Sequence, residues 1–280
     1  MIREVGHDGL VLRVRDEGPR SGEAVLLLHG FPQDASCWDD VVPGLHDEGL
    51  RTLAPDQRGY SPGARPDDVC DYRVERLTGD ALAVLDACGV ERAHVVGHDW
   101  GGAVAWRLGA QHPERVASLT VLSTPHPAAL ARSMGTSLQA ARSWYMLAVQ
   151  VPVLPEVLLS RILATTLRAS GLAPGPAARY AARLSGPGDL RGPLGWYRAA
   201  VRRPPWQLLA LLTGDTGVVS VPTTYVWGRH DPALGGPAAR GTGDHVLGDY
   251  RFTQLDAGHW LPEMHPGAVV EAVLDRAGRS

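Results

Sequence analysis

Short apolar runs alternate with helical patterns along most of this chain, and this alternation restricts the possible folds more than any other feature. Residues 24–29 (AVLLLH) and 93–97 are apolar at almost every position, as expected for strands that are buried on both faces. Residues 76–88 between them have apolar positions at helical spacing and end before Gly89, a typical helix stop. The alternation predicts an α/β fold with a mostly parallel central sheet and flanking helices.

The same pattern extends to both ends of the chain but is interrupted in the middle. Further strands are predicted at residues 8–16, 51–55, 116–122, 222–227 and 251–255, and further helices at 103–111 and 267–277. Between about residues 126 and 217 strand character is weak, and helical patches such as 137–150 and 155–168 replace it. We therefore predict a core domain, residues 1–125 and 218–280, that is split by a helical cap domain, residues 126–217.

Composition excludes several classes of function. With 44% hydrophobic and 20% charged residues the chain is typical of a globular protein, and its net charge of −3 gives no reason to expect nucleic acid as a partner. The three cysteines are scattered, so we expect neither a disulfide framework nor a metal site. No apolar run reaches the ~18 residues that a membrane span needs, and the first residues do not resemble a signal peptide. We expect a cytoplasmic protein without membrane insertion.

One turn between a strand and a helix carries an acid between glycines. Val95-Val96 leads into Gly97-His98-Asp99-Trp100-Gly101, and a helix follows. A nucleophile at such a corner projects above the sheet, and glycines on both sides allow the strand and the helix to pack closely. An aspartate at the first helical turn is also a common helix N-cap, so this stretch alone leaves both interpretations open.

Four more motifs accompany this corner in a fixed chain order. The five are HGFPQ (29–33), DQRGYS (56–61), GHDWGG (97–102), WGRHD (227–231) and GHWLPE (258–263). Together they resemble the α/β-hydrolase superfamily, and within it the branch that uses an aspartate nucleophile, which comprises epoxide hydrolases and haloalkane dehalogenases. The resemblance covers the chain from His29 to its last helix. It implies an α/β-hydrolase fold with an inserted cap.

The resemblance also implies a role for each part of the site. Asp99 would attack carbon and form an alkyl–enzyme ester, His259 would activate the water that hydrolyses this ester, and Asp231 would orient His259. The backbone N–H groups of Phe31 and Trp100 would form the oxyanion hole. A cis peptide bond before Pro32, the residue after Phe31, is also implied.

Less specific explanations exist for two members of this triad. His259 could be structural, with His230 and His265 as the rival bases. Asp231 precedes Pro232, and Asp-Pro is a frequent turn dipeptide. The segment after the strand at 116–122 (STPHPAAL) contains no carboxylate that could replace Asp231.

Two tyrosines in the predicted cap decide between the leaving groups. Tyr145 and Tyr197 lie in SWYMLAVQVP and LGWYR, which resemble the two cap tyrosine motifs of epoxide hydrolases. A phenol with a pKa of about 10 stays protonated at neutral pH and can donate to an epoxide oxygen. Both rings could instead be ordinary core aromatics of a lid.

We predict an epoxide hydrolase that acts with water on a small lipophilic epoxide, needs no metal or organic cofactor, and forms a possible homodimer. The lipophilic substrate rests on apolar cap residues predicted to line the pocket: Leu147, Val149, Val151, Leu154 and the leucines of 157–163 and 208–212. The predicted substrate-binding residues are Trp38, Trp144, Gln150, Trp196 and Trp260. The first alternative is a haloalkane dehalogenase with the same triad, in which Trp100 and Trp144 or Trp196 bind halide. A weaker alternative is a non-catalytic protein that only binds a ligand.

Overall fold

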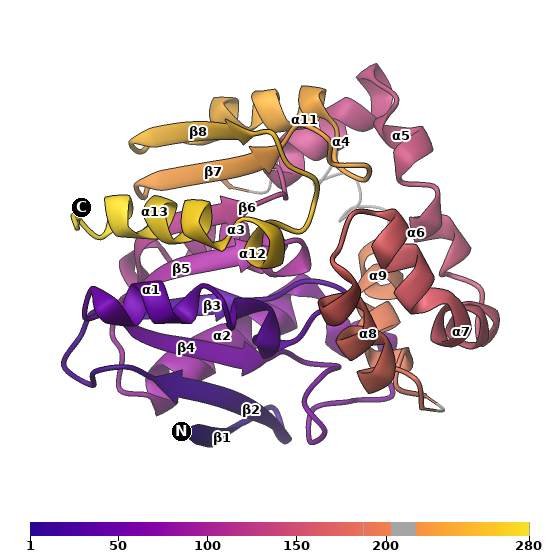
Figure 1. Cartoon of the computed structure of the whole chain (residues 1–280), viewed down its shortest axis with the longest axis horizontal. Coiled ribbons are helices and arrows are strands. Elements are labelled where there is room, and N and C mark those ends of the chain that lie inside the picture. Colours follow the sequence, from indigo (N-terminus) through magenta and orange to yellow (C-terminus); the bar gives the residue numbers. More distant parts are fainter. Residues whose placement is uncertain (187, 203–216, 280) are drawn as a thin grey trace.

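A single sheet of eight strands forms the centre of the molecule (Figure 1). The structure is a computed structural model that describes residues 1–186, 188–202 and 217–279. The strand order is β1-β2-β4-β3-β5-β6-β7-β8. The strands are β1 (Ile2–His7), β2 (Leu10–Glu17), β3 (Ala24–Leu28), β4 (Arg51–Asp56), β5 (Ala93–His98), β6 (Val116–Leu122), β7 (Thr223–Gly228) and β8 (Tyr250–Leu255).

The sheet is parallel from β4 to β8, whereas β1 and β2 are antiparallel additions at one edge. Every residue of β3, β4 and β5 is buried, because helices cover both faces of these strands. The predicted α/β class and its mostly parallel sheet are confirmed.

The start of the chain differs from the expected single strand at residues 8–16. Asp8 and Gly9 both have positive φ, 52° and 74°, and form a two-residue turn between β1 and β2. Asp-Gly is a preferred sequence for such hairpin turns because both residues tolerate this conformation. The alternating pattern therefore contains two strands rather than one.

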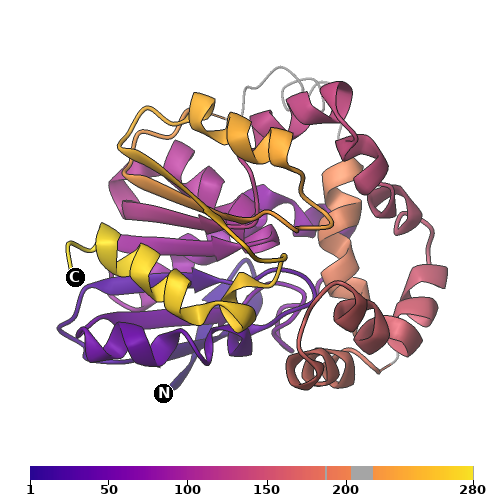
Figure 2. The same ribbon diagram turned by 45° about the horizontal axis from the view of Figure 1, so that its top comes forward.

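Helices form a layer on each face of the sheet. The helices α2 (Val74–Ala87) and α3 (Trp100–Gln111) pack together on one face, and α1 (Val42–Asp47) and α13 (Pro266–Arg276) pack on the other (Figures 1 and 2). The carboxyl ends of the parallel strands all point to the same edge of the sheet. Loops at this edge therefore bring distant parts of the chain together.

The described chain between β6 and β7 is helical, and most of it lies beyond that edge (Figure 1). Its helices are α4 (Pro127–Thr136), α5 (Gln139–Arg142), α6 (Tyr145–Ala148), α7 (Leu154–Ala169), α8 (Pro174–Arg183) and α9 (Arg191–Val201). The helical patch expected at 137–150 is two short helices, α5 and α6, separated at Ser143 and Trp144. The leucines at 208–212 lie outside the described residues. Within the described ranges, no helix has the length and apolarity to cross a bilayer.

Candidate active site

The strand β5 ends in a sharp corner at Asp99. The backbone of Asp99 has φ 50° and ψ −119°, and its side chain makes no capping hydrogen bond to the helix α3 that follows. A Cβ on Gly97 would lie 2.3 Å from the carbonyl oxygen of Gly101, and a Cβ on Gly101 would lie 2.0 Å from that of Leu28. The flanking glycines thus permit the close approach, and the strained corner directs Asp99 away from its own helix. The helix-cap interpretation is wrong.

The Asp99 carboxylate lies in a cradle of backbone groups. Its Oδ1 accepts a hydrogen bond of 2.8 Å from the N–H of Phe31, and the N–H of Trp100 is the second backbone group that favours the charged carboxylate. The loop before Phe31 fits closely, since a Cβ on Gly30 would lie 2.4 Å from the Cβ of Asp99. The peptide bond between Phe31 and Pro32 is cis, as expected. Burial raises the pKa of Asp99, although His259 and the two N–H groups oppose this shift.

His259 lies between the two acids. Its Nδ1 is 2.7 Å from Oδ2 of Asp231, and its Nε2 is 3.7 Å from Oδ2 of Asp99. The other oxygen of Asp231 accepts hydrogen bonds from the N–H groups of Ala233 and Leu234, so its carboxylate is held on both sides. Burial lowers the pKa of His259, but Asp231 and then Asp99 outweigh this effect and raise it to about 9.

His230, a rival base considered from the sequence, lies outside the group formed by Asp99, His259 and Asp231. His230 is exposed and pairs with the exposed Asp256, with 2.7 Å between His230 Nε2 and Asp256 Oδ1. His265 is half-buried at the start of α13. Asp231 does form a turn with its neighbours, yet it contacts His259 with its remaining oxygen.

A buried polar network behind the triad was not predicted from the sequence. The His98 ring lies between Gln33 Oε1 and the carbonyl oxygen of His259, at 2.8 Å and 2.9 Å from its two nitrogens. Gln33 donates to Glu263, which also accepts from the Tyr180 hydroxyl of α8. Gln33, His98 and Glu263 stand within the quoted motifs. Position within a motif loop was therefore the only available signal.

Tyr145 and Tyr197, the two tyrosines predicted in the cap, contact each other near the turn at Asp99. The rings of Tyr145 and Tyr197 contact each other edge to face with centroids 5.9 Å apart, and Tyr197 also packs against Trp100 and Phe31. Burial raises the pKa of both phenols, and the Asp99 charge raises them further. Both hydroxyls therefore remain protonated and lie within the electrostatic reach of Asp99.

The structure shows the surroundings of four of the five predicted substrate-binding residues, whose contact with substrate stays a prediction. Trp38 is fully buried. Trp196 is also buried, and its indole N–H donates to the Arg58 carbonyl at 2.8 Å. Trp144 is 67% exposed on the cap surface. Gln150 donates to the carbonyl oxygens of Met146 and Tyr197 and accepts from Arg202. Its amide therefore connects α6 and α9.

Trp260, the fifth, packs edge to face on His259 at 5.0 Å and donates to Ser170 at 3.0 Å. It lies at the site and supports the base, and its contact with substrate stays a prediction.

The expected apolar lining from the cap is in part exposed to solvent. Leu147, Val151 and Leu154 are between 48% and 68% exposed, whereas Val149 is buried. Helical periodicity reveals an apolar stripe but does not reveal whether it faces the pocket or solvent. The described walls near Asp99 are aromatic instead, formed by the rings that pack around Tyr197.

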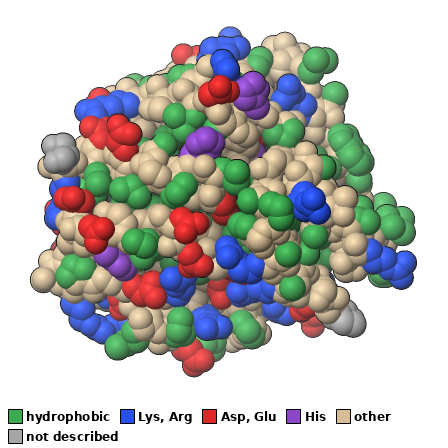
Figure 3. Space-filling view, viewed as in Figure 1, with side chains coloured by type: hydrophobic (Ala, Val, Ile, Leu, Met, Phe, Trp, Pro, Cys, Tyr) green, Lys and Arg blue, Asp and Glu red, His purple; other side chains and the backbone are tan. Residues whose placement is uncertain are grey.

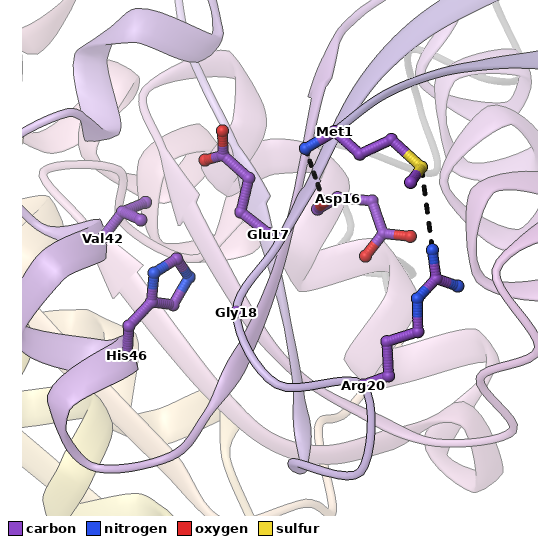
Figure 4. A pocket seen from close by; sticks show the side chains of 7 residues that line it. All are labelled: Met1, Asp16, Glu17, Gly18, Arg20, Val42 and His46. Atoms are coloured by element: carbon purple, nitrogen blue, oxygen red, sulfur yellow. Dashed lines mark hydrogen bonds between the residues drawn. The ribbon is translucent and has the colours of Figure 1, made fainter.

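A surface hollow of about 520 Å³ lies elsewhere, where β2 ends and β4 begins (Figure 4). Its lining residues are Met1, Asp16, Glu17, Gly18, Arg20, Val42 and His46. His46 there is 2.9 Å from the Thr52 hydroxyl. The hollow contains no member of the triad and is at the opposite edge of the sheet from Asp99.

Comparison with known proteins gives a consistent assignment. Residues 23–266 match the family described as the alpha/beta hydrolase fold. The chain is 35% identical to Epoxide hydrolase A of Mycobacterium tuberculosis (98% of this chain, 96% of that protein) and 33% identical to the AB hydrolase superfamily protein YfhM of Bacillus subtilis (97% and 96%). The crystal structure of Epoxide Hydrolase A from Mycobacterium thermoresistibile superposes with a TM-score of 0.85 at 30% identity, over 99% of this chain and 97% of that one. The chain thus has the α/β-hydrolase fold and belongs to the epoxide hydrolase family.

Proposed function

We propose that this enzyme hydrolyses an epoxide to a vicinal diol through a covalent ester on Asp99. The observation that carries the proposal is the pair of tyrosines, Tyr145 and Tyr197, which pack edge to face on each other while Tyr197 packs on Trp100, the neighbour of Asp99. An epoxide needs a nucleophile at carbon and an acid at oxygen at the same time. Asp99 and the two tyrosines supply these groups from opposite sides of one space.

In the first step, Oδ2 of Asp99 attacks an epoxide carbon. Oδ1 is the oxygen that accepts from Phe31, so Oδ2 is the more available nucleophile. The carbon–oxygen bond of the ring breaks, and the released oxygen takes a proton from a tyrosine.

In the second step, His259 takes a proton from water as the water oxygen attacks the ester carbon. The negative charge develops on Oδ1, which already accepts from the N–H of Phe31, and the N–H of Trp100 is the second proposed donor. Each such donor is worth about 3–4 kcal/mol of transition-state stabilisation. The tetrahedral intermediate then collapses: the ester C–O bond breaks, and the released diol oxygen takes the proton that His259 holds. The proton that remains on the former water oxygen passes to the tyrosinate left by the first step, so that the phenol and the Asp99 carboxylate are both restored. Asp231 stabilises the imidazolium that forms in between.

The dehalogenase alternative is weakened by the state of the indole groups. A halide site needs N–H donors that are free to bind an anion. The N–H of Trp196 is occupied by the Arg58 carbonyl, and Trp144 is exposed on the cap. The complete contact series Asp99–His259–Asp231 also argues against a protein that only binds ligand.

Parallel assays with a panel of epoxides and haloalkanes test this proposal. We expect diol from at least one epoxide and no halide release above background. Halide release without diol formation would favour the dehalogenase, and binding without turnover of any member would favour the ligand-binding alternative. We keep three statements as predictions: that residues 126–217 form a cap domain, that the location is cytoplasmic, and that a homodimer forms.

A further inference from the structure

The outer face of the cap carries an unusual concentration of exposed apolar side chains. Of the sixteen exposed large apolar side chains in the described part of the chain, eight lie between residues 144 and 162. These are Trp144, Leu147, Val151, Val153, Leu154, Val157, Leu158 and Ile162. We call this set the cap patch. Figure 3 shows hydrophobic side chains at the right-hand edge of the molecule, where α6 and α7 lie in Figure 1.

The helix α7 explains how the patch arises. Its Leu163 and Leu167 are buried, and this face packs against α8. The other face exposes Leu154, Leu158 and Ile162, which recur at a spacing of four residues. The helix is therefore apolar on both faces, and its second apolar face meets solvent. Contiguous exposed apolar surface of this kind marks an interaction site in most soluble proteins.

The charge around the patch restricts what can cover it. Residues 126–202 contain nine arginines and two acidic residues, although the whole chain has a net charge of −3. Arg161 and Arg168 lie exposed on α7 itself, without an acidic partner in the described part of the chain. Glu156, the acid of this helix, is bound to Arg198. The surface that fits this face must therefore be both apolar and anionic.

We infer that the cap patch docks the enzyme onto an anionic lipid surface. Tryptophan and leucine on one face with arginine beside them are the features of helices that lie in the plane of a bilayer interface, which requires no membrane span. A second copy of this chain fits less well. A twofold contact through the patch would bring together the same arginine-bearing surface of both copies, because such an interface uses one patch twice. An anionic bilayer neutralises these charges instead.

Vesicle flotation with the full chain tests this inference. The probes are vesicles of phosphatidylcholine alone and of an equimolar mixture of phosphatidylcholine and phosphatidylglycerol. We expect the protein to float with the mixed vesicles and not with the neutral ones, and to dissociate as salt is added. Failure to bind the mixed vesicles at low salt would overturn the inference.

Two double variants separate the contributions of the arginines and of the apolar side chains to vesicle binding. Arg161→Gln with Arg168→Gln should weaken binding about thirtyfold, because each basic residue near an anionic surface contributes about fivefold. Leu158→Gln with Ile162→Gln should reduce binding to background. The matched controls are Arg240→Gln and Leu247→Gln, two exposed residues of the core. Equal losses in the controls would overturn the inference.

Sedimentation equilibrium tests whether a second copy of this chain covers the cap patch instead of a lipid surface. We expect the apolar double variant to keep the oligomeric state of the parent chain, and its thermal unfolding midpoint to stay close to that of the parent. A dimer that dissociates in this variant would mean that a second copy covers the patch, and would overturn the lipid assignment.

Discussion

At the scale of single residues, the two oxygens of Asp99 have different surroundings. Oδ1 accepts from the backbone of Phe31, and Oδ2 faces His259 at 3.7 Å. In the proposed mechanism, Oδ2 therefore attacks the epoxide carbon and Oδ1 carries the negative charge of the tetrahedral intermediate. The closeness of Oδ2 to His259 also couples the titration of His259 to the chemical state of Asp99.

That coupling gives a pH prediction. In the free enzyme the carboxylates of Asp231 and Asp99 outweigh the effect of burial and raise the pKa of His259 to about 9. Alkylation makes Asp99 a neutral ester, so its share of this shift disappears and the pKa of His259 falls. Only neutral imidazole accepts a proton from water. We expect the rate of ester hydrolysis, followed by rapid quench, to rise with pH to a plateau with a midpoint below 9. A midpoint at or above 9 would show that esterification does not release the base.

The two phenols give a second prediction at this scale. Tyr145→Phe or Tyr197→Phe alone should slow alkylation, and the double variant should slow it by about 10³ or more, because general acid catalysis typically contributes 10²–10⁴. Hydrolysis of an ester already formed should be unaffected. The matched control is Tyr250→Phe on β8, which should alkylate at the parent rate. Parent-like alkylation in the double variant would mean that the phenols are not the proton donors.

At the scale of elements, Tyr145 lies on α6 and Tyr197 lies on α9, and Gln150 connects these two helices. Its amide donates to Met146 of α6 and to Tyr197 of α9. We expect Gln150→Met to slow alkylation about tenfold, since small displacements of reacting groups cost up to 10² in rate. Ester hydrolysis should keep its rate, because the contact between His259 and Asp231 is untouched. Thr166→Val on α7 serves as the control. An equal loss in both steps would indicate a general structural defect instead.

The helix α8 is joined to the core by Arg183. Its guanidinium lies 2.8 Å from Asp34 and 2.7 Å from Asp56, and both carboxylates are almost completely buried. Arg183→Gln leaves these charges without their cation, so we expect the free energy of unfolding to drop by about 2 kcal/mol. Arg191→Gln, which breaks an exposed pair with Asp67, should cost less than about 0.5 kcal/mol. Chemical denaturation of both variants measures the loss in the free energy of unfolding. Equal losses would contradict a stabilising role for the ion pairs of Arg183 with Asp34 and Asp56.

Elements of the core were predictable because their patterns permit one interpretation. The strand at 116–122 was predicted with its observed bounds, and β3 and β5 within one residue, since continuous apolar runs between turn residues predict buried parallel strands. The cap was less predictable. The patch at 137–150 contains apolar residues on more than one side, so periodicity suggested a helix but did not reveal the break at Trp144 or its exposure. Residues 203–216 lie outside what the structure describes.

At the scale of the whole molecule, the sequence motifs indicated the candidate catalytic residues. Only the tertiary fold shows which other residues contact them. The triad and both cap tyrosines converge from β5, the loops after β7 and β8, and two cap helices. The network through Gln33, His98 and Glu263 could not be predicted, because it depends on contacts between loops that are over 60 residues apart in sequence. Trp196 has the residue type of a ligand-binding aromatic, yet a backbone carbonyl occupies its N–H.

The central claim is that Asp99 itself attacks carbon, and single turnover in ¹⁸O-labelled water tests it most directly. With enzyme in excess over epoxide, the first diol should contain an unlabelled oxygen that comes from the Asp99 carboxylate. The peptide that contains Asp99 should gain ¹⁸O in exchange, and multiple turnovers should then yield labelled diol. Solvent label in the first-turnover diol would instead mean that water attacks the epoxide directly, and would contradict the covalent mechanism.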